Sequence, residues 1–455
     1  MMLARAPAFA AGIEHPDIGT IAIGRGGAYA ADPTDGLAMQ YNPAGFASQH
    51  GLRLTLDANL SFQQLSFAAA SGGTASNSAG GFLVGAPIVS YGFGPVGPLS
   101  ALTVAIGFTT PSAIGQESYP GTHPPAMPLP AAQDPQRYAI MSTDYFIIYY
   151  SAAIAASYKD WLSAGVTLQL VHGSAKFSQA VWSGPYMGTD PAFDAVANVD
   201  VSNTVVPTAV FGVTVRPIPK LALGLSYRPR FDFLAHGTLT TDLPPAATAL
   251  AVTVVGNSTD FFLRFPDVIR LGAQYAIKSR LRVEADVVAE LWSELHTIEI
   301  RPQNIHITTP MPTDRTLANI VFQKDYQDSI SVRVGADYDL LPNRLTVRAG
   351  YLHETSAIPL KSVSVDFGNW QRDVVSVGAT VKIWRGLNAS AAYAHHFIAD
   401  QSVTNSQVVQ VVTPCSTMGC TDPAPTVVGN GVYKASLDVV SLSLGAILDD
   451  FRPRP

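Results

Sequence analysis

The residues of this chain that could do chemistry are few. His395 and His396 are adjacent in a segment whose polarity alternates, so their side chains point to opposite faces and cannot hold one metal ion together. The chain contains no GxSxG, HExxH or phosphate-binding pattern, and Gly24, Gly26 and Gly27 lack the dinucleotide-binding spacing. We therefore expect no catalytic residue, no metal and no cofactor, and hence no enzyme.

The only two cysteines, Cys415 and Cys420, lie in the polar stretch TPCSTMGCTDP. No histidine stands beside them, so a small loop disulfide in an oxidising compartment is favoured over a metal site. This pairing predicts that the chain works outside the cytoplasm.

Composition indicates that much of the surface does not face water. Of 455 residues, 47% are hydrophobic and only 14% are charged, whereas soluble domains carry about 25% charged residues. The net charge of -6 is not gathered into tails, which argues against a nucleic-acid partner. No apolar run reaches the roughly 18 to 20 residues that a spanning helix needs.

The first residues, MMLARAPAFAAG, resemble the end of a secretory signal. Arg5 precedes small residues, and Ala8-Phe9-Ala10 has the A-x-A form of a cleavage site. We assign residues 1–11 to a residual signal segment; a disordered N-terminus is the alternative.

From residue 51 onward, apolar and polar residues alternate with a period of two, which is typical of strands with two different faces. In residues 281–292 (LRVEADVVAELW), one face carries leucine, valine and alanine and the other carries Arg282, Glu284, Asp286 and Glu290. The sequence therefore predicts an all-β protein.

Fourteen such segments occur, joined by short and long connections in strict alternation. Short turns on one side and long loops on the other are typical of a closed transmembrane barrel, whereas a soluble sandwich has no reason to keep that order. We predict an antiparallel barrel over residues 51–448 and a C-terminal tail over 449–455. The predicted strands are 51–64, 80–92, 99–110, 138–158, 161–180, 202–216, 220–236, 261–277, 280–301, 324–339, 344–354, 371–384, 387–398 and 433–447.

Residues 12–50 do not alternate and are rich in glycine and small residues. Asp32 can cap a helix that starts at Pro33 and runs to Tyr41, where the Asn42-Pro43 step ends it. Gly26 and Gly27 would allow tight turns. We expect a compact helical hatch inside the barrel lumen.

The stretch GRGGAYAADPTDGLAMQYNPAGFA resembles the hatch signature of the FadL/TodX family, with Asn42-Pro43-Ala44 at the family's NPA motif. The resemblance continues through YYSAAIAASYKDWLSAGVTLQLVHGSAKFSQ, FPDVIRLGAQYAIKSRLRVEADVVAELWSEL and LTVRAGYLHETSAIP, and so covers nearly the whole chain. It implies a monomeric barrel of fourteen strands, closed by the hatch, that carries long-chain fatty acids or aromatic hydrocarbons. The gating residues it implies are Asn42, Pro43, Ala44, Gly26 and Gly27.

Two features depart from the family pattern. Phe451 is followed by RPRP instead of closing the chain, and the long loop 399–432 with its cysteine pair matches no family feature that we can name.

Charged residues in the alternating segments should point into the lumen, because charge on the lipid face costs roughly 2 to 4 kcal/mol at the midplane. Most would form ion pairs there. Some arginines would instead receive a ligand carboxylate, since guanidinium binds carboxylate in bidentate geometry. The candidates are Arg228, Arg270, Arg282 and Arg333.

The third strand contains Phe108 and ends near Pro111, which cannot donate a ladder hydrogen bond. The family resemblance implies a kink and a gap in the wall here, and so a lateral exit; an ordinary strand end is the alternative.

Together these features predict outer-membrane transport of hydrophobic small molecules, long-chain fatty acids first, by passive diffusion. Aromatic hydrocarbons by the same route are the first alternative, and a barrel-borne enzyme or adhesin is the second. The expected partners are the hydrophobic ligand, outer-membrane lipid, lipopolysaccharide and the barrel-assembly machinery.

Overall fold

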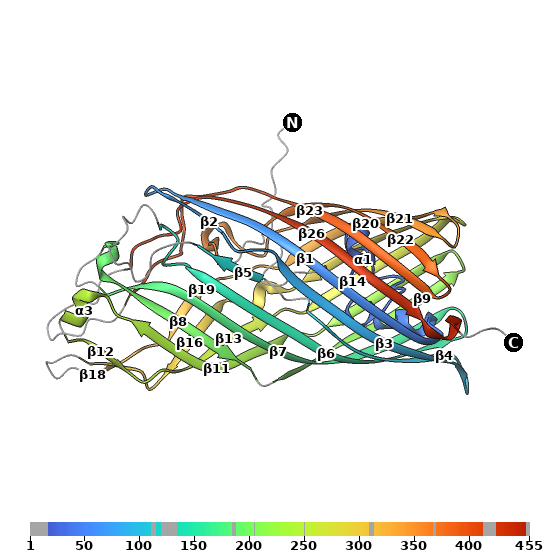
Figure 1. Cartoon of the computed structure of the whole chain (residues 1–455), viewed down its shortest axis with the longest axis horizontal. Helices are drawn as coiled ribbons and strands as arrows, with labels where there is room; N and C mark the ends of the chain where they lie inside the picture. The colour runs from blue at the N-terminus through green and yellow to red at the C-terminus, as the bar shows by residue number, and fades with distance from the viewer. Residues whose placement is uncertain are drawn as a thin grey trace.

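A computed structural model shows a closed antiparallel barrel with small helices in its lumen (Figure 1). It describes residues 17–110, 115–119, 134–183, 188–203, 205–249, 251–308, 314–366, 370–412 and 425–451. The predicted signal segment, Pro111, Cys415 and Cys420 lie outside these residues. The barrel closes where β1 (Gly51–Ala69) pairs with β26 (Gly431–Ile447), from Arg53 opposite Ile447 to Ala69 opposite Gly431.

Fourteen barrel strands are present in the described ranges, as the sequence predicts, and each pairs antiparallel with its neighbours. Several consist of two segments separated by an interruption. In chain order they are β1, β3 (Phe82–Val96), β4 (Leu99–Thr109) with β5 (Gly115–Ser118), β6 (Ser142–Tyr158), β7 (Leu162–Trp182), β8 (Asp194–Ser202) with β9 (Val206–Ile218), β10 (Leu221–Arg228) with β11 (Phe231–Asp242), β13 (Ser258–Phe265) with β14 (Val268–Lys278), β15 (Leu281–Glu290) with β16 (Thr297–Gln303), β19 (Ile320–Gln323) with β20 (Ser329–Leu341), β21 (Leu345–Glu354), β22 (Arg372–Trp384), β23 (Leu387–Ile398) with β24 (Gln401–Val403), and β26.

The short connections are confirmed, while several long ones contain more strand than the sequence predicts. Six turns of two or three residues join the strands at one end of the barrel. At the other end, β8 starts at Asp194, inside the predicted loop 181–201, and β11 continues to Asp242. The prediction was wrong there because these extensions do not look like lipid-facing strands in the sequence. Their inward positions are apolar, but their outward positions carry polar residues, whereas a lipid-facing strand has apolar residues outside.

The interruptions fall at one level of the wall. Pro229 separates β10 from β11 and Pro266 separates β13 from β14, because a proline cannot donate a ladder hydrogen bond. Between β8 and β9, the Asn203 side chain makes hydrogen bonds to β7 in place of backbone groups. Gly173 N–H donates to Asn203 Oδ1 at 2.7 Å, and Asn203 Nδ2 donates to Val171 O at 3.0 Å.

Below this level the outward face is apolar, with Leu225, Leu271 and Val377 among its exposed side chains. Aromatic side chains border this belt near the short turns, as in transmembrane barrels; they are Tyr91, Phe93, Tyr158, Trp161, Tyr275, Tyr338 and Trp384. Within the described ranges, no helix has the length and apolar character to cross a membrane.

Above this level the outward face is polar. Arg264 of β13 pairs with Asp232 of the neighbouring β11 at 2.6 Å. Arg301 pairs with Glu299 of the same strand, β16, at 2.8 Å. This part of the wall therefore extends beyond the lipid into water at the end that carries the long connections.

A charge placed in the belt should destabilise the barrel. Val377 faces outward near the middle of β22 and is 53% exposed. We expect Val377→Arg to lower the free energy of unfolding by about 2 to 4 kcal/mol, measured by denaturant titration in phospholipid vesicles. Thr238→Arg, on the polar part of β11, is the matched control. Equal losses for both variants would contradict the assignment of the belt.

Candidate functional site

The N-terminal segment (residues 17–50) lies inside the barrel near the end with the short turns (Figure 1). It contains α1 (Thr20–Gly24), α2 (Ala38–Tyr41) and η1 (Pro43–Ser48). Helix α1 contacts β22 and β23, whereas η1 contacts β6 and β7 on another side of the wall. Most of its residues are buried, so it fills this part of the lumen.

The predicted helix from Pro33 to Tyr41 is wrong in its first half. Only Ala38–Tyr41 is helical, and α1 was not predicted. The Asp32 carboxylate does not cap a helix, because it accepts a hydrogen bond from Arg216 Nη2 on β9 at 2.5 Å. The Asp35 side chain forms a local turn instead by accepting from Leu37 N–H at 3.0 Å.

Carboxylates of the barrel wall hold the N-terminal segment by its backbone. Asp286 Oδ2 accepts from Tyr29 N–H at 2.7 Å and Ala30 N–H at 2.8 Å. Glu284 accepts from Ala31 N–H at 2.8 Å and also pairs with Arg25. Hydrogen bonds to charged groups are worth about 1.5 to 3 kcal/mol each, so these contacts fix the segment firmly.

Asp57 on β1 makes a similar anchor on the opposite side. Its Oδ2 accepts from Thr20 N–H at 2.7 Å and from Thr20 Oγ1 at 2.8 Å. The start of α1 lacks a side-chain cap of its own, so Asp57 satisfies one backbone donor, Thr20 N–H, that the short helix leaves open.

Asn42 joins three parts of the structure. Its Oδ1 accepts from Ala44 N–H at 3.1 Å and so caps η1. Its Nδ2 donates to Ala30 O at 2.7 Å and to Thr214 Oγ1 of β9 at 3.2 Å. Pro43 then starts η1, where its fixed φ suits a helical turn. The predicted gating motif therefore lies at a contact between the N-terminal segment and the wall.

Two wall glycines allow this close contact. A Cβ on Gly212 would lie 2.0 Å from Asn42 Oδ1, and one on Gly350 would lie 2.1 Å from Arg25 C. Gly26 and Gly27 have positive φ values of 62° and 76°, in agreement with the predicted tight turn.

A ring of charged side chains follows the wall just above the N-terminal segment. The strand registers place Arg228 opposite Val268, Val268 opposite Glu290, and Glu354 opposite Arg372. Arg270 lies two residues beyond Val268, and Arg333 two residues beyond Ser331, the partner of Glu354, both on the side of the short turns. All are buried. The charged ring consists of Arg228, Arg270, Glu290, Arg333, Glu354 and Arg372.

The charged ring contacts the N-terminal segment at two points. Arg333 pairs with Asp17 at 2.5 Å. The Arg270 guanidinium lies over the ring of Tyr41, 5.8 Å from its centroid, and Tyr41 Oη accepts from Ile18 N–H at 3.1 Å. Arg270 is only 5% exposed, yet its Nε and Nη1 have no hydrogen-bond partner.

The structure brings three of the four candidate arginines together. Arg228, Arg270 and Arg333 lie within electrostatic range of one another. Arg282 lies near the short turn after β14 and donates to both carboxylate oxygens of Asp339, at 3.0 and 3.2 Å. Its position is thus away from the charged ring.

Aromatic side chains fill the lumen above the charged ring. Phe231 stacks on Phe265 with centroids 4.8 Å apart, and Tyr149 meets Phe231 edge-on at 6.3 Å. Arg228 lies 5.9 Å from the Phe231 centroid. These rings, with Phe233 at 6.3 Å from Phe265, form an apolar layer directly over the arginines.

A cavity of about 670 Å³ opens above this layer, among the outer ends of the strands. We call it the vestibule. Pockets of 300 to 1,000 Å³ with few polar groups are typical for small ligands. Apolar lining residues include Phe193, Leu239, Val252, Val254, Ile307 and Phe322.

An ion pair of Arg137 stabilises one wall of the vestibule. Arg137 Nε pairs with Asp194 Oδ2 at 2.6 Å, and Tyr138 Oη donates to Asp194 Oδ1 at 2.5 Å. Tyr138 itself lines the cavity. Because Arg137 and Asp194 are both buried, this pair fixes the residues after 134 against β8.

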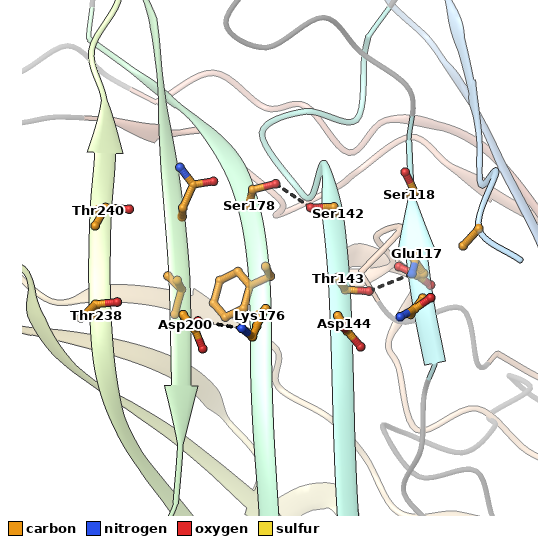
Figure 2. A pocket seen from close by; sticks show the side chains of 15 residues that line it. Glu117, Ser118, Ser142, Thr143, Asp144, Lys176, Ser178, Asp200, Thr238 and Thr240 are labelled. Atoms are coloured by element: carbon orange, nitrogen blue, oxygen red, sulfur yellow. Dashed lines mark hydrogen bonds and ion pairs between the residues drawn. The ribbon is translucent and has the colours of Figure 1, made fainter. Parts of the chain in front are cut away.

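A second hollow, about 630 Å³, lies over β5, β6, β7, β8 and β11 (Figure 2). Its exposed polar groups bond to one another: Lys176 pairs with Asp200 at 2.9 Å, and Ser142 and Ser178 are 2.7 Å apart. An apolar ligand gains nothing from such a surface, so the vestibule is the better candidate site.

Among the residues that the structure describes, the hydrogen-bond ladder of the wall has a gap beside the apolar layer. The β3–β4 ladder ends at the pair Ile88 and Gly107, although β3 starts six residues earlier at Phe82. Phe108 follows Gly107 and stands opposite Tyr150 of β6 in the register. The rings of Phe108 and Tyr150 face outward, with their centroids 6.5 Å apart. The predicted exit residue Phe108 thus stands at this gap.

Sequence reasoning missed Asp17 and Tyr41 as site residues. Asp17 and Tyr41 lie in the segment without periodicity, so no pattern shows which way they point. Within the described ranges, no group of three or more His, Cys, Asp or Glu side chains is placed to hold a metal.

One family model matches residues 1–420 of the chain; it is described as outer membrane protein transport protein (OMPP1/FadL/TodX). Among solved structures, a FadL homologue of Pseudomonas aeruginosa is 15% identical with a TM-score of 0.74, covering 98% of this chain and 100% of that one. The toluene transporter TodX of Pseudomonas putida is 14% identical with a TM-score of 0.64, covering 97% and 100%.

The toluene transporter TbuX of Ralstonia pickettii is 14% identical with a TM-score of 0.62, covering 94% of this chain and 98% of that one. At such identities, the structural likeness concerns the fold. No curated protein sequence is significantly similar to the chain.

Removing a wall anchor should open the lumen. Asp286→Leu leaves Tyr29 and Ala30 N–H groups without acceptors, at a cost of about 1 to 3 kcal/mol for each buried donor. We expect a clear rise in ion conductance in planar bilayers over the unaltered protein, and a smaller rise for Asp286→Asn, which keeps an acceptor oxygen. Asp200→Asn on the outer face is the control. Unchanged conductance of Asp286→Leu would show that Asp286 does not hold the segment.

Proposed function

The chain belongs to the outer membrane protein transport protein family (OMPP1/FadL/TodX), and on that premise we propose that it carries long-chain fatty acids inward by passive diffusion. The family and the fold make it an outer-membrane channel for hydrophobic compounds and not an enzyme. The proposal includes a monomeric barrel that contacts outer-membrane lipid and lipopolysaccharide and is inserted by the barrel-assembly machinery.

The observation that carries the proposal is the vestibule above a lumen filled by the N-terminal segment. Its apolar lining suits a hydrocarbon chain, and burial of apolar area contributes about 25 cal/mol per Å². The lumen below is occupied by residues 17–50. A ligand therefore collects in the vestibule and moves on only when the segment, which acts as the hatch, rearranges around Asn42, Pro43, Ala44, Gly26 and Gly27.

Arg270 supports a fatty acid as the ligand. Its guanidinium has two buried nitrogen atoms without hydrogen-bond partners, and Arg228, which lies within its electrostatic range, contacts the apolar layer at Phe231. Burying an unpaired charged donor is costly, and carboxylate is its natural complement. A fatty acid would place its carboxylate at Arg270, beside Arg228 and Arg333, and its chain among Phe231 and Phe265.

The gap between β3 and β4 supports a lateral exit. Tyr149, which contacts the apolar layer through Phe231, pairs with Thr109, the last residue of β4. The apolar layer thus reaches the place where the ladder is open. A ligand released here by rearrangement of the N-terminal segment enters the membrane directly through the wall.

Aromatic hydrocarbons are the second candidate ligand. The stacked pair Phe231 and Phe265, with Tyr149 edge-on, offers the geometries in which aromatic rings attract one another. TodX and TbuX, which share the fold, are toluene transporters. A neutral ring would use the same route without Arg270.

Loss of Arg270 should separate the two ligand classes. We expect Arg270→Met to lower uptake of radiolabelled oleate about tenfold, because a charged hydrogen bond worth about 1.5 kcal/mol or more is lost. Uptake of toluene should stay unchanged. The measurement uses cells that lack their own transporter, with Arg264→Met on the outer face as the control. Undiminished oleate uptake would remove Arg270 from the ligand site.

Closing the wall gap should stop transport. Pro87 and Phe108 are the next residues in register after the pair Ile88 and Gly107. We expect oxidised Pro87→Cys/Phe108→Cys protein to lose most oleate uptake and to regain it with a reductant. Ala336→Cys/Ala349→Cys, a registered pair in the continuous wall, is the control. Full uptake by completely cross-linked protein would contradict the lateral exit.

A further inference from the structure

Strand β19 has one edge that no other strand in the described residues covers. It pairs only with β16. Directly after this ladder, Lys324 N–H donates to His296 O at 2.8 Å. Along an antiparallel strand, residues that bond to the partner alternate with residues whose backbone groups point away from it. Phe322 therefore bonds to β16, and the backbone N–H and C=O groups of Val321 point to the uncovered edge.

The vestibule reaches this uncovered edge. Successive side chains of a strand face opposite sides: Ile320 and Phe322 pack against the core of the lumen, whereas Val321 faces outward and is 50% exposed. All three nevertheless line the cavity, as does Gln323. A cavity that touches both faces of one strand extends around its edge, and β16 occupies the other edge of β19.

The edge lacks two features by which proteins prevent another chain from pairing with a strand, namely charged side chains and prolines. Residues 317–323 (LANIVFQ) contain neither. The backbone groups of Val321 lie between the apolar residues Ile320 and Phe322. A hydrogen bond formed in such surroundings is stronger than one in water. The vestibule therefore offers a ligand one backbone donor and one backbone acceptor beside an apolar lining.

A single extended amino-acid residue has the groups that match this edge. Its N–H and C=O point to the same side, so it exchanges two hydrogen bonds with one residue of a strand. An ionised fatty acid offers only acceptor oxygens, and an aromatic hydrocarbon offers neither group. An amino acid that is acylated on its nitrogen combines the two matching groups with a hydrocarbon chain.

We propose that the vestibule binds N-acylated amino acids, whose amide N–H donates to Val321 O while a carboxylate oxygen accepts from Val321 N–H. This inference rests on the proposed function and narrows its ligand class. The acyl chain lies along the apolar lining, which includes Leu239, Val254 and Ile307. The cavity of about 670 Å³ is within the range of pockets that hold small ligands.

Two ligands of the same chain length isolate the amide hydrogen bond. N-Dodecanoylglycine carries the N–H group, whereas its ester analogue, O-dodecanoylglycolate, has an oxygen atom in that place. Dodecanoate is the reference ligand for the proposed function. Binding of all three at neutral pH is measured by equilibrium dialysis against the purified full-length barrel, with detergent alone as the blank.

We expect the unaltered protein to bind N-dodecanoylglycine about tenfold more tightly than the ester, because the ester lacks the hydrogen-bond donor. Val321→Pro removes the N–H at the edge, and a strand tolerates proline where that group lies outside the ladder. This variant should lower the ratio of N-dodecanoylglycine to dodecanoate affinity about tenfold. Val321→Ala keeps the N–H and is the matched control, for which the ratio should not change.

Equal affinities of the unaltered protein for the amide and the ester would overturn this inference and leave the proposed function standing. So would an unchanged ratio of N-dodecanoylglycine to dodecanoate affinity in Val321→Pro protein that keeps the heat-resistant folded form. If Val321→Pro does not fold, the comparison of amide and ester in the unaltered protein decides alone. Failure of the unaltered protein to bind any of the three ligands would contradict the proposed function as well.

Discussion

The interaction on which the rest of the structure depends is the hydrogen bonding of wall carboxylates to the backbone of the N-terminal segment. Asp57, Glu284 and Asp286 accept from N–H groups that short helices and turns leave open. A barrel of this width would otherwise enclose water. With the segment bound, the lumen is closed from below, and an apolar layer and a vestibule exist above the charged ring.

The bilayer imposes the second constraint, since every backbone group in lipid needs a partner inside the protein. The closed ladder from β1 to β26 meets it. In the part of the chain that the structure describes, the ladder between β3 and β4 has no pair above Ile88 and Gly107, next to the aromatic side chains of the lumen. The proposed exit at this position suits a ligand that is itself soluble in lipid and not a hydrophilic solute.

The barrel was predictable because alternation and turn spacing are local features of the sequence. The burial of Arg228, Arg270 and Arg333 follows from the same alternation. Their grouping, and the separate place of Arg282, depend on strand register, which the sequence does not reveal. The helix at Pro33 was predicted wrongly because Arg216, far along the chain, binds Asp32. Long-range contacts of this kind override local capping preferences.

The central claim, that the chain moves a hydrophobic ligand through a barrel closed by its N-terminal segment, is tested most directly by uptake of radiolabelled oleate. Cells without their own transporter would express the unaltered chain, Asn42→Ala or an empty vector. We expect saturable uptake with the unaltered chain and a marked loss with Asn42→Ala, because the contacts to Ala30, Ala44 and Thr214 disappear. Correctly inserted protein that takes up neither oleate nor toluene would contradict the account.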